Sequence, residues 1–190
     1  MPSPRQPINR ILVTGGAGFI GSHVCDTLLS SGMTVLALDD LSSGRLENLS
    51  AAENNPDFRF AELDVTNEAD LDQSFADFEP DAVIHLAAQA SVPLGEADPS
   101  KNFRLNVGAT QVVAEAARRS ACRRIVFSSS AAVYGDSEEF PLTEGSATKP
   151  ISQYGTSKLM SEEVLEAYGQ SFGLTATSFR FFNVYGPRQD

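Results

Sequence analysis

The segment RILVTGGAGFIGSH, residues 10–23, joins a short apolar run to the start of an amphipathic stretch through closely spaced glycines. The run Ile11–Val13 is aliphatic throughout, as in a strand buried on both faces of a parallel sheet. Gly15, Gly18 and Gly21 then recur at a spacing of three. In such a pattern the first glycine permits a tight turn, the second admits a pyrophosphate, and the third lets the helix pack against the strand. The segment therefore predicts a strand, a phosphate-binding turn, and a helix whose N-terminus faces the phosphate.

A second apolar run, Val35–Leu38, ends in acidic residues. Asp39 lies 18 residues beyond Gly21, about where a carboxylate must stand to hydrogen-bond the ribose 2′-hydroxyl of a dinucleotide. An Asp here favours NAD over NADP, because it would repel the 2′-phosphate of NADP. The glycines alone also fit an ordinary turn, and Asp39 alone a solvated loop acid, but with two strands beside them they predict a dinucleotide site. The polar loop 39–45 can wrap an adenine or ribose, although a generic turn has the same composition. Its candidate contacts are Asp40, Ser43 and Gly44.

Composition limits the possible partners. The 190 residues carry a net charge of −11, which argues against nucleic acid, since that binding depends on neutralising phosphates. No apolar run approaches the roughly 20 residues that a membrane-spanning helix needs. Residues 1–9 contain three prolines and predict a flexible tail. Cys25 and Cys122 lie far apart and outside any metal-type cluster, so we expect two buried thiols in a reducing cytoplasm and no metal site.

Apolar runs and helical stripes alternate along the rest of the chain, without an internal repeat or a composition break. Further strands are expected at 33–38, 58–63, 81–87, 124–128 and 174–182, and helices at 19–31, 67–78, 101–120 and 152–172. We expect Gly32 to end the first helix, and Asn67 or Thr66 to cap the second. The pattern predicts an α/β fold in one domain, residues 10–190. That fold is a doubly wound parallel sheet of the Rossmann type, with strand order 3-2-1-4-5-6 and right-handed crossovers.

Two stretches at the ends of later elements carry candidate catalytic groups. The run IVFSSSAAVYG, 125–135, ends a strand in three consecutive hydroxyls, and Tyr154 and Lys158 open the following helix four residues apart, on one face. A neighbouring ammonium lowers a phenol pKa from about 10, and an oxidised nicotinamide adds positive charge, so Tyr154 becomes a usable base near neutral pH. Ser130 is placed to share the substrate's proton. Alone, the Tyr/Lys pair fits a helix surface and the serines a turn, but after the glycine pattern they predict a catalytic site.

Six segments, in this order and spacing, resemble the extended short-chain dehydrogenase/reductases, specifically the NAD-dependent nucleotide-sugar epimerase/dehydratase group. They are TGGAGFIGSH, DDLSSG, HLAAQASV, SSSAAVYG, YGTSK and RFFNVYGPRQ. The resemblance runs from about Arg10 to the last residue and is greatest to UDP-glucose 4-epimerase and its UDP-N-acetylhexosamine and UDP-uronate relatives. It implies NAD as cofactor, a UDP-sugar as substrate, and epimerisation at C4 through a transient 4-keto sugar.

The resemblance also implies roles for particular residues. Those expected to bind NAD are Gly15, Gly18, Phe19, Ile20 and Gly21 at the pyrophosphate, Asp39 at the ribose, Asp64 and Val65 at the adenine, and Leu86, Ala87, Ala88 and Gln89 along the channel, with Asp40, Ser43, Gly44, Ser128 and Phe181 as further contacts. Tyr154 is expected to act as the base, Lys158 to bind the nicotinamide ribose and tune Tyr154, and Ser130 to hydrogen-bond the substrate. Ser91, Val92 and Asn183 are expected to contact the sugar nucleotide.

Two departures from the group bear on function. Its dehydratases place an Asp-Glu pair directly after the catalytic hydroxyl, to supply the acid and base for losing water, whereas this chain has Ala131 and Ala132. Dehydration is therefore not expected. Members of the group also continue well past the point that matches Asp190, as a smaller domain over the sugar nucleotide. We therefore expect a truncated form of weak activity that lacks this domain.

Other functions stay open at this point. One is a nucleotide-sugar reductase or decarboxylase on the same scaffold. Another is a non-catalytic NAD-binding regulator, for which a broken Tyr/Lys pair is expected, whereas this chain keeps the pair. The resemblance suggests a homodimer through helices 101–120 and 152–172, packed as a four-helix bundle, while periodicity shows only that each helix has an apolar face.

Overall fold

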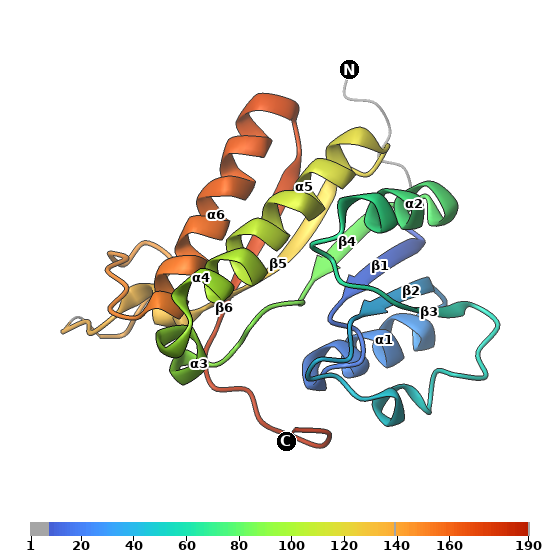
Figure 1. Ribbon diagram of the computed structural model, residues 1–190, viewed down its shortest axis with the longest axis horizontal. Coiled ribbons are helices and arrows are strands. Elements are labelled where there is room, and N and C mark those ends of the chain that lie inside the picture. Colours follow the sequence, from blue (N-terminus) through green and yellow to red (C-terminus); the bar gives the residue numbers. More distant parts are fainter. Residues whose placement is uncertain (1–7, 139, 190) are drawn as a thin grey trace.

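The computed structural model describes residues 8–138 and 140–189, with a parallel sheet at the centre (Figure 1). The strands are β1 (Arg10–Thr14), β2 (Thr34–Asp39), β3 (Phe58–Glu62), β4 (Ala82–His85), β5 (Arg124–Ser130) and β6 (Thr175–Phe181). They form one six-stranded sheet in the order β3-β2-β1-β4-β5-β6, and every neighbouring pair is parallel. The predicted sheet and its strand order are confirmed. Of the predicted tail, residues 1–7 lie outside the described residues, while Ile8 and Asn9 are exposed.

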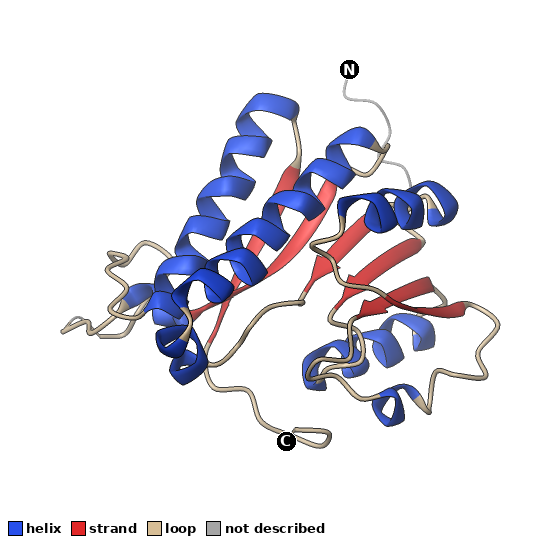
Figure 2. Ribbon diagram, in the orientation of Figure 1, coloured by secondary structure: helices blue, strands red, loops and turns tan. Residues whose placement is uncertain are grey.

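Helices cover both faces of the sheet (Figure 2). They are α1 (Phe19–Ser30), α2 (Glu68–Phe78), α3 (Val92–Ala97), α4 (Pro99–Phe103), α5 (Ala109–Arg119) and α6 (Gln153–Phe172), with a π-helical turn at Arg104–Gly108 and 3₁₀ turns at Leu46–Leu49 and Ala131–Tyr134. On one face α2, α5 and α6 pack over the larger core, which includes Phe75, Val113 and Leu165. On the other face α1 covers a smaller core around Val13 and Cys25. Both cysteines are buried and free, as expected.

Local signals set where several helices begin and end. The side chain of Asn67 accepts a hydrogen bond from the backbone N of Asp70, so it is the cap of α2 that was expected. Ser152 caps α6 by accepting from Gly155 N at 3.0 Å. Gly173 follows α6 with φ 72°, and Gly32 follows α1 with φ 78°, the left-handed conformation that closes helices at little cost in glycine.

The predicted helix over 101–120 is confirmed as a continuous helical stretch through Arg119, but it is not regular, because a π-helical turn lies between α4 and α5. That turn carries Asn106, which is 2% exposed and hydrogen-bonds through its side chain to the backbone of Gln89. The buried amide's hydrogen bonds offset the loss of regular helix geometry. The strand predicted over 81–87 is too long. β4 ends at His85 because the N–H of Ala87 donates to a side-chain oxygen, Oγ1 of Thr14 at 3.2 Å, and not to a backbone carbonyl of a neighbouring strand.

Candidate active site

The glycine-rich turn lies between β1 and α1, at the carboxyl edge of the sheet. Gly15 has φ 70°, and a Cβ added there would stand 2.7 Å from the backbone N of Ala87. A Cβ added to Gly21 would stand 2.0 Å from the carbonyl oxygen of Gly15. Helix α1 begins after Gly18 with no side-chain cap and no acidic residue in its first turn. The backbone N–H groups of Phe19, Ile20 and Gly21 at this end therefore offer hydrogen bonds to an anion.

Asp39 ends β2 beside this turn. Its carboxylate accepts hydrogen bonds from Ala17 N at 3.0 Å and from Leu41 N at 2.9 Å, and only 7% of the residue is exposed. Burial raises the pKa of Asp39, while the two backbone donors lower it. A Cβ added to Gly44 would stand 2.6 Å from Oδ1 of Asp39, so the loop closes tightly on the carboxylate. The carboxylate is thus held next to the glycine-rich turn.

The other adenine and ribose candidates differ in exposure. Asp40 and Ser43 are exposed, and the carboxylate of Asp40 accepts hydrogen bonds from the backbone and side chain of Ser42. Asp64 is also exposed, and its carboxylate accepts from the backbone N of the second residue after it at 2.8 Å. Val65 is 7% exposed and belongs to the larger core, so its side chain serves packing.

The segment after β4 holds the four channel candidates, which are Leu86, Ala87, Ala88 and Gln89, all half-buried. The side-chain oxygen of Gln89 is buried and has no hydrogen-bond partner among the described residues. An unpaired buried acceptor is costly unless a ligand supplies the donor. Together with the glycine-rich turn and the open N-terminus of α1, this unpaired oxygen indicates that the residues present fit a dinucleotide.

Ser130, Tyr154 and Lys158 meet at the carboxyl end of β5. Ser130 is the last residue of β5, Tyr154 lies in the first turn of α6, and the Ser130 hydroxyl is close enough to the phenol to lower the pKa of Tyr154. Lys158, one turn further along α6, is 2% exposed and donates from Nζ to the carbonyl oxygen of Ser128 at 2.7 Å. β5 runs two residues beyond the predicted end at 128, which places all three consecutive serines within the strand.

The electrostatics at these residues differ from the expectation that Lys158 depresses the pKa of Tyr154. In the chain by itself burial raises the pKa of Tyr154, and the hydrogen bond with Ser130 lowers it by less. The Lys158 Nζ lies 5.9 Å from the centroid of the Tyr154 ring and 4.8 Å from that of Phe127. Burial lowers the pKa of Lys158 to about 7. At neutral pH the lysine therefore carries only part of its charge, which weakens its effect on the phenol.

Asn106, which sequence analysis did not single out, joins these parts of the site. Its Nδ2 donates to the side-chain oxygens of Asn102 and Ser157, both at 2.9 Å, and its Oδ1 accepts from Gln89 N at 2.8 Å. Ser157 Oγ in turn donates to the carbonyl oxygen of Tyr154 at 2.8 Å. The network ties the segment after β4 to the first turn of α6. Its sequence signal was two asparagines four residues apart among apolar residues of a predicted helix.

The sugar-nucleotide candidates lie on two segments. Ser91 caps α3 by accepting from the backbone N of Leu94 at 3.4 Å, and Val92 starts that helix with 40% of its surface exposed. Asn183 is exposed in the segment after β6. The remaining cofactor candidates, Ser128 in β5 and Phe181 at the end of β6, are half-buried.

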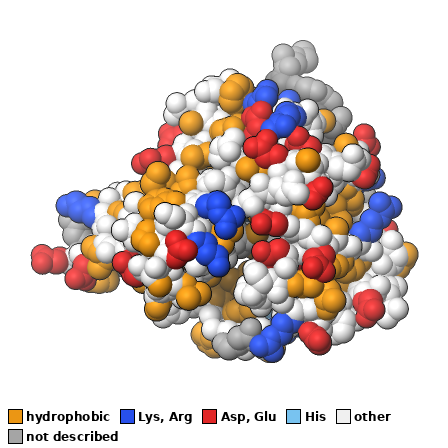
Figure 3. All heavy atoms as spheres, in the orientation of Figure 1, with side chains coloured by type: hydrophobic (Ala, Val, Ile, Leu, Met, Phe, Trp, Pro, Cys, Tyr) orange, Lys and Arg blue, Asp and Glu red, His pale blue; other side chains and the backbone are white. Residues whose placement is uncertain are grey.

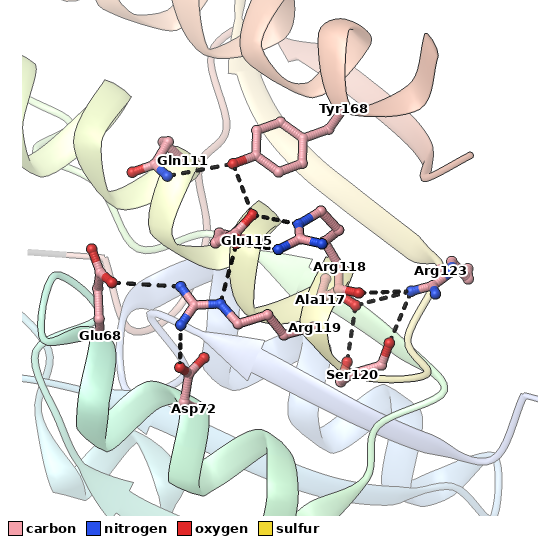
Figure 4. Close-up of polar contacts among 10 residues, drawn as sticks. All are labelled: Glu68, Asp72, Gln111, Glu115, Ala117, Arg118, Arg119, Ser120, Arg123 and Tyr168. Carbon is pink, nitrogen blue, oxygen red and sulfur yellow. Dashed lines mark hydrogen bonds and ion pairs between the residues drawn. The ribbon is translucent and has the colours of Figure 1, made fainter. Parts of the chain in front are cut away.

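A cavity of about 970 Å³ opens at the opposite, amino-terminal edge of the sheet. Three of its arginines already have partners. Arg10 donates to the carbonyl oxygen of Phe78. Arg119 pairs with Asp72 at 2.6 Å, and Arg123 donates to carbonyl oxygens at the end of α5, as Figure 4 shows. These bonds close helix ends and join α2 to α5, so the cavity is explained by packing.

Neither a metal-ligand cluster nor a membrane-spanning helix is found among the described residues. Within residues 8–138 and 140–189, no three His, Cys, Asp or Glu side chains group closely enough to hold a metal ion. In the same part of the chain, no helix has the length and apolar character to cross a membrane.

Known proteins resemble this chain in both sequence and fold. The family model described as "NAD dependent epimerase/dehydratase family" matches residues 11–190. The UDP-glucose 4-epimerase of Mycolicibacterium smegmatis is 44% identical over 182 residues, which are 95% of this chain and 58% of that protein.

Two solved structures resemble the chain in fold as well as in sequence. The UDP-glucose 4-epimerase of Thermotoga maritima, solved with UDP-glucose, is 40% identical with a TM-score of 0.90, covering 95% of this chain and 58% of that one. A dTDP-glucose 4,6-dehydratase of Streptomyces venezuelae, solved with NAD, is 35% identical with a TM-score of 0.90, covering 95% and 57%. The chain spans a little over half the length of these relatives. Because the family model matches almost every residue, the chain belongs to the NAD-dependent epimerase/dehydratase family.

Proposed function

We propose that this chain carries the NAD-binding and catalytic half of a UDP-sugar 4-epimerase. The observation that carries the proposal is the grouping of Ser130 at the end of β5 with Tyr154 and Lys158, one helical turn apart on α6, where Ser130 lowers the pKa of the Tyr154 phenol and Lys158 is anchored on the carbonyl oxygen of Ser128. These side chains lie at the same edge of the sheet as the glycine-rich turn. The named epimerases that the chain resembles support this choice of reaction.

The solved dehydratase on the same fold makes dehydration the first rival. Eliminating water needs an additional acid and base beside the reacting sugar. In this chain Ala131 and Ala132 directly follow Ser130, in the 3₁₀ turn after β5, and neither side chain can transfer a proton. This favours epimerisation over dehydration. A reductase, a decarboxylase and a non-catalytic NAD-binding protein remain alternatives that the assays below distinguish.

In the proposed reaction Tyr154 takes the proton of the sugar 4-hydroxyl and later returns it. NAD, when bound, supplies the acceptor and donor of a hydride at C4, so no net oxidation results. Ser130 hydrogen-bonds the same hydroxyl and orients it toward the phenol, while Lys158 holds the nicotinamide ribose. Because Tyr154 is partly withdrawn from water, its proton transfer is directed to the substrate. The 4-keto sugar must turn within the site, so binding energy has to come from the unreacting nucleotide.

The cofactor site that we propose begins with Gly15, Gly18 and Gly21 at the pyrophosphate and Asp39 at the adenosine ribose. The preference for NAD rests on Asp39, whose negative charge repels a 2′-phosphate. The remaining contacts that we propose are Phe19, Ile20, Asp40, Ser43, Gly44, Asp64, Val65, Leu86, Ala87, Ala88, Gln89, Ser128 and Phe181 for NAD, and Ser91, Val92 and Asn183 for the UDP-sugar.

We further propose that a smaller domain completes the sugar pocket, and that α5 and α6 form a homodimer as a four-helix bundle. The first part is supported by the greater length of the relatives and by Phe182, which is 62% exposed beside the site. The second is supported by Met160 on α6, which is 41% exposed, and by the apolar side chains that gather near α4 in Figure 3. Sedimentation velocity measures the oligomeric state directly.

Calorimetry tests the cofactor assignment. We expect the chain to bind NAD more tightly than NADP, and Asp39→Ala to weaken NAD and relieve the rejection of NADP. Asp57→Ala, at an exposed acid in the loop before β3, is the matched control and should leave both affinities unchanged. Equal affinity of the unaltered chain for the two cofactors would remove Asp39 from this role.

Turnover of UDP-glucose and UDP-galactose in the presence of NAD tests the reaction. We expect slow epimerisation by these 190 residues, because ordering of the sugar is proposed to depend on the smaller domain. Tyr154→Phe should lower kcat by about 10²–10⁴-fold while UDP-sugar affinity changes little. Tyr168→Phe, near the other end of the same helix, is the control and should retain the rate. If Tyr154→Phe kept more than half of the activity, another residue would have to be the base.

A further inference from the structure

Glu162 and Arg180 form a half-buried ion pair between α6 and β6, close in sequence to the proposed site. Glu162 lies on α6, one helical turn beyond Lys158, and Arg180 lies in β6. Their contact is bidentate, with Nη2 to Oε2 at 2.8 Å and Nε to Oε1 at 3.0 Å. The side chains are 14% and 21% exposed. A bidentate pair of this kind restricts the relative position of the two elements that carry it.

The pair also reaches three further segments. Ser129 Oγ, in β5, donates to Oε1 of Glu162. Arg180 Nη1 donates to the hydroxyl of Tyr134 at 3.1 Å and to the carbonyl oxygen of Glu144 at 3.3 Å, and the guanidinium lies 4.9 Å from the centroid of the Tyr134 ring. One ion pair therefore joins α6, β5, β6, the 3₁₀ turn after β5, and the loop that follows this turn.

These connections place the pair between the two elements that carry the proposed proton-transfer groups. Ser129 precedes Ser130 in the chain, and Glu162 follows Tyr154 by two helical turns. A shift of β5 along α6 would change the Ser130 to Tyr154 separation directly. A partly buried ion pair adds little net stability, because desolvation offsets most of its attraction. Its directional hydrogen bonds instead fix the position of β5 relative to α6.

We propose that Glu162 and Arg180 are positioning residues that act through Ser129 to hold the end of β5 against α6, which keeps Ser130 next to Tyr154. The inference rests on the proposed function, since it concerns how the same site is held. Neither side chain of the pair touches the reacting groups themselves.

The chain contains a matched pair elsewhere. Glu115 accepts a bidentate contact from Arg118 at 2.6 and 2.7 Å and a hydrogen bond from the hydroxyl of Tyr168, as Figure 4 shows. The Glu115 side chain is 19% exposed, close to the value for Glu162. This second cluster joins α5 to α6 without contacting β5. Glu115→Gln therefore removes a carboxylate from a similar bidentate ion pair, at a place that should not influence Ser130.

The test reads the surroundings of the Tyr154 hydroxyl by NMR, using the chain with ¹³Cζ-labelled tyrosine at neutral pH and no ligand. Tyr154→Phe assigns the resonance, and Ser130→Ala shows where it moves when the serine hydroxyl is lost. We expect Glu162→Gln and Ser129→Ala to move it in the same direction as Ser130→Ala, and Glu115→Gln to leave it in place. Glu162→Asp, which keeps the charge, should restore part of the displacement.

Turnover supplies an independent readout. A misplacement of about 1 Å can cost on the order of 100-fold in rate, so we expect Glu162→Gln to lower kcat toward that extent with KM little changed. A Tyr154 resonance unmoved by both Glu162→Gln and Ser129→Ala would overturn the inference. If Glu162→Gln does not fold, judged by circular dichroism, Ser129→Ala decides alone. The NMR result needs neither NAD nor UDP-sugar, so failure of the proposed function and failure of this inference are distinguishable.

Discussion

Lys158 is a buried lysine that forms no ion pair with a carboxylate of the described residues, and its removal gives a quantitative test of the electrostatics. Its Nζ has the carbonyl oxygen of Ser128 as acceptor and the rings of Phe127 and Tyr154 as neighbours. Burial lowers its pKa from 10.5 to about 7. The folded chain thus binds fewer protons than the unfolded chain between these two values, so its stability must rise with pH across that range.

The size of the effect follows from the two pKa values. Each pH unit between them changes the free energy of unfolding by up to about 1.4 kcal/mol. From pH 7 to pH 9 the integrated gain is about 2 kcal/mol, because the folded lysine is already half deprotonated at pH 7. Lys158→Met keeps a long side chain and removes the titration. The unaltered chain should therefore gain about 2 kcal/mol over Lys158→Met across this interval.

Urea unfolding followed by circular dichroism at pH 7, 8 and 9 measures this difference. Cys25 and Cys122 also titrate in this region, because burial raises both thiol pKa values, but they are present in both chains and cancel. Lys101→Met, at an exposed lysine of α4, is the control and should follow the unaltered chain. Parallel pH dependences for the unaltered chain and Lys158→Met would refute the argument that burial depresses this lysine.

Two further predictions concern the same edge of the sheet. Burial lowers the pKa of His85 from 6.5 to about 3, so the folded chain binds fewer protons than the unfolded chain between these values and loses stability as the pH falls below about 6.5. Between pH 7 and pH 5 the free energy of unfolding of the unaltered chain should fall by about 2 kcal/mol relative to His85→Gln, measured by urea titration. Gly21→Ala should abolish NAD binding by calorimetry, because its Cβ would stand 2.0 Å from a backbone oxygen of the phosphate turn. Gly145→Ala is the control and should bind normally, because its Cβ would come no closer than 3.9 Å to a neighbouring atom.

Local pattern was enough to predict most of the fold. The aliphatic run Val35–Leu38 is short and bounded by polar residues, a pattern typical of a strand buried on both faces of a parallel sheet, and it lies in β2. Their alternation with helical stripes leaves a parallel sheet with right-handed crossovers, and the glycine-rich turn places its first strand at the centre. The same turn, together with Asp39, Ser130, Tyr154 and Lys158, gave the candidate site, because those residue types carry their chemistry in short, recognisable spacings.

Only the tertiary structure decided how those residues are held and charged. Asn106 bonds to Ser157 across 51 positions, and Ser129 to Glu162 across 33, which no local period encodes. The π-helical turn within helix 101–120 has the same origin, since it carries a buried amide bonded to distant segments, whereas the apolar stripe by itself favours a regular helix. The opposite directions of the Lys158 and Tyr154 pKa shifts also arose from packing. Desolvation depends on every element that surrounds a group, whereas sequence spacing reveals only which groups share a face.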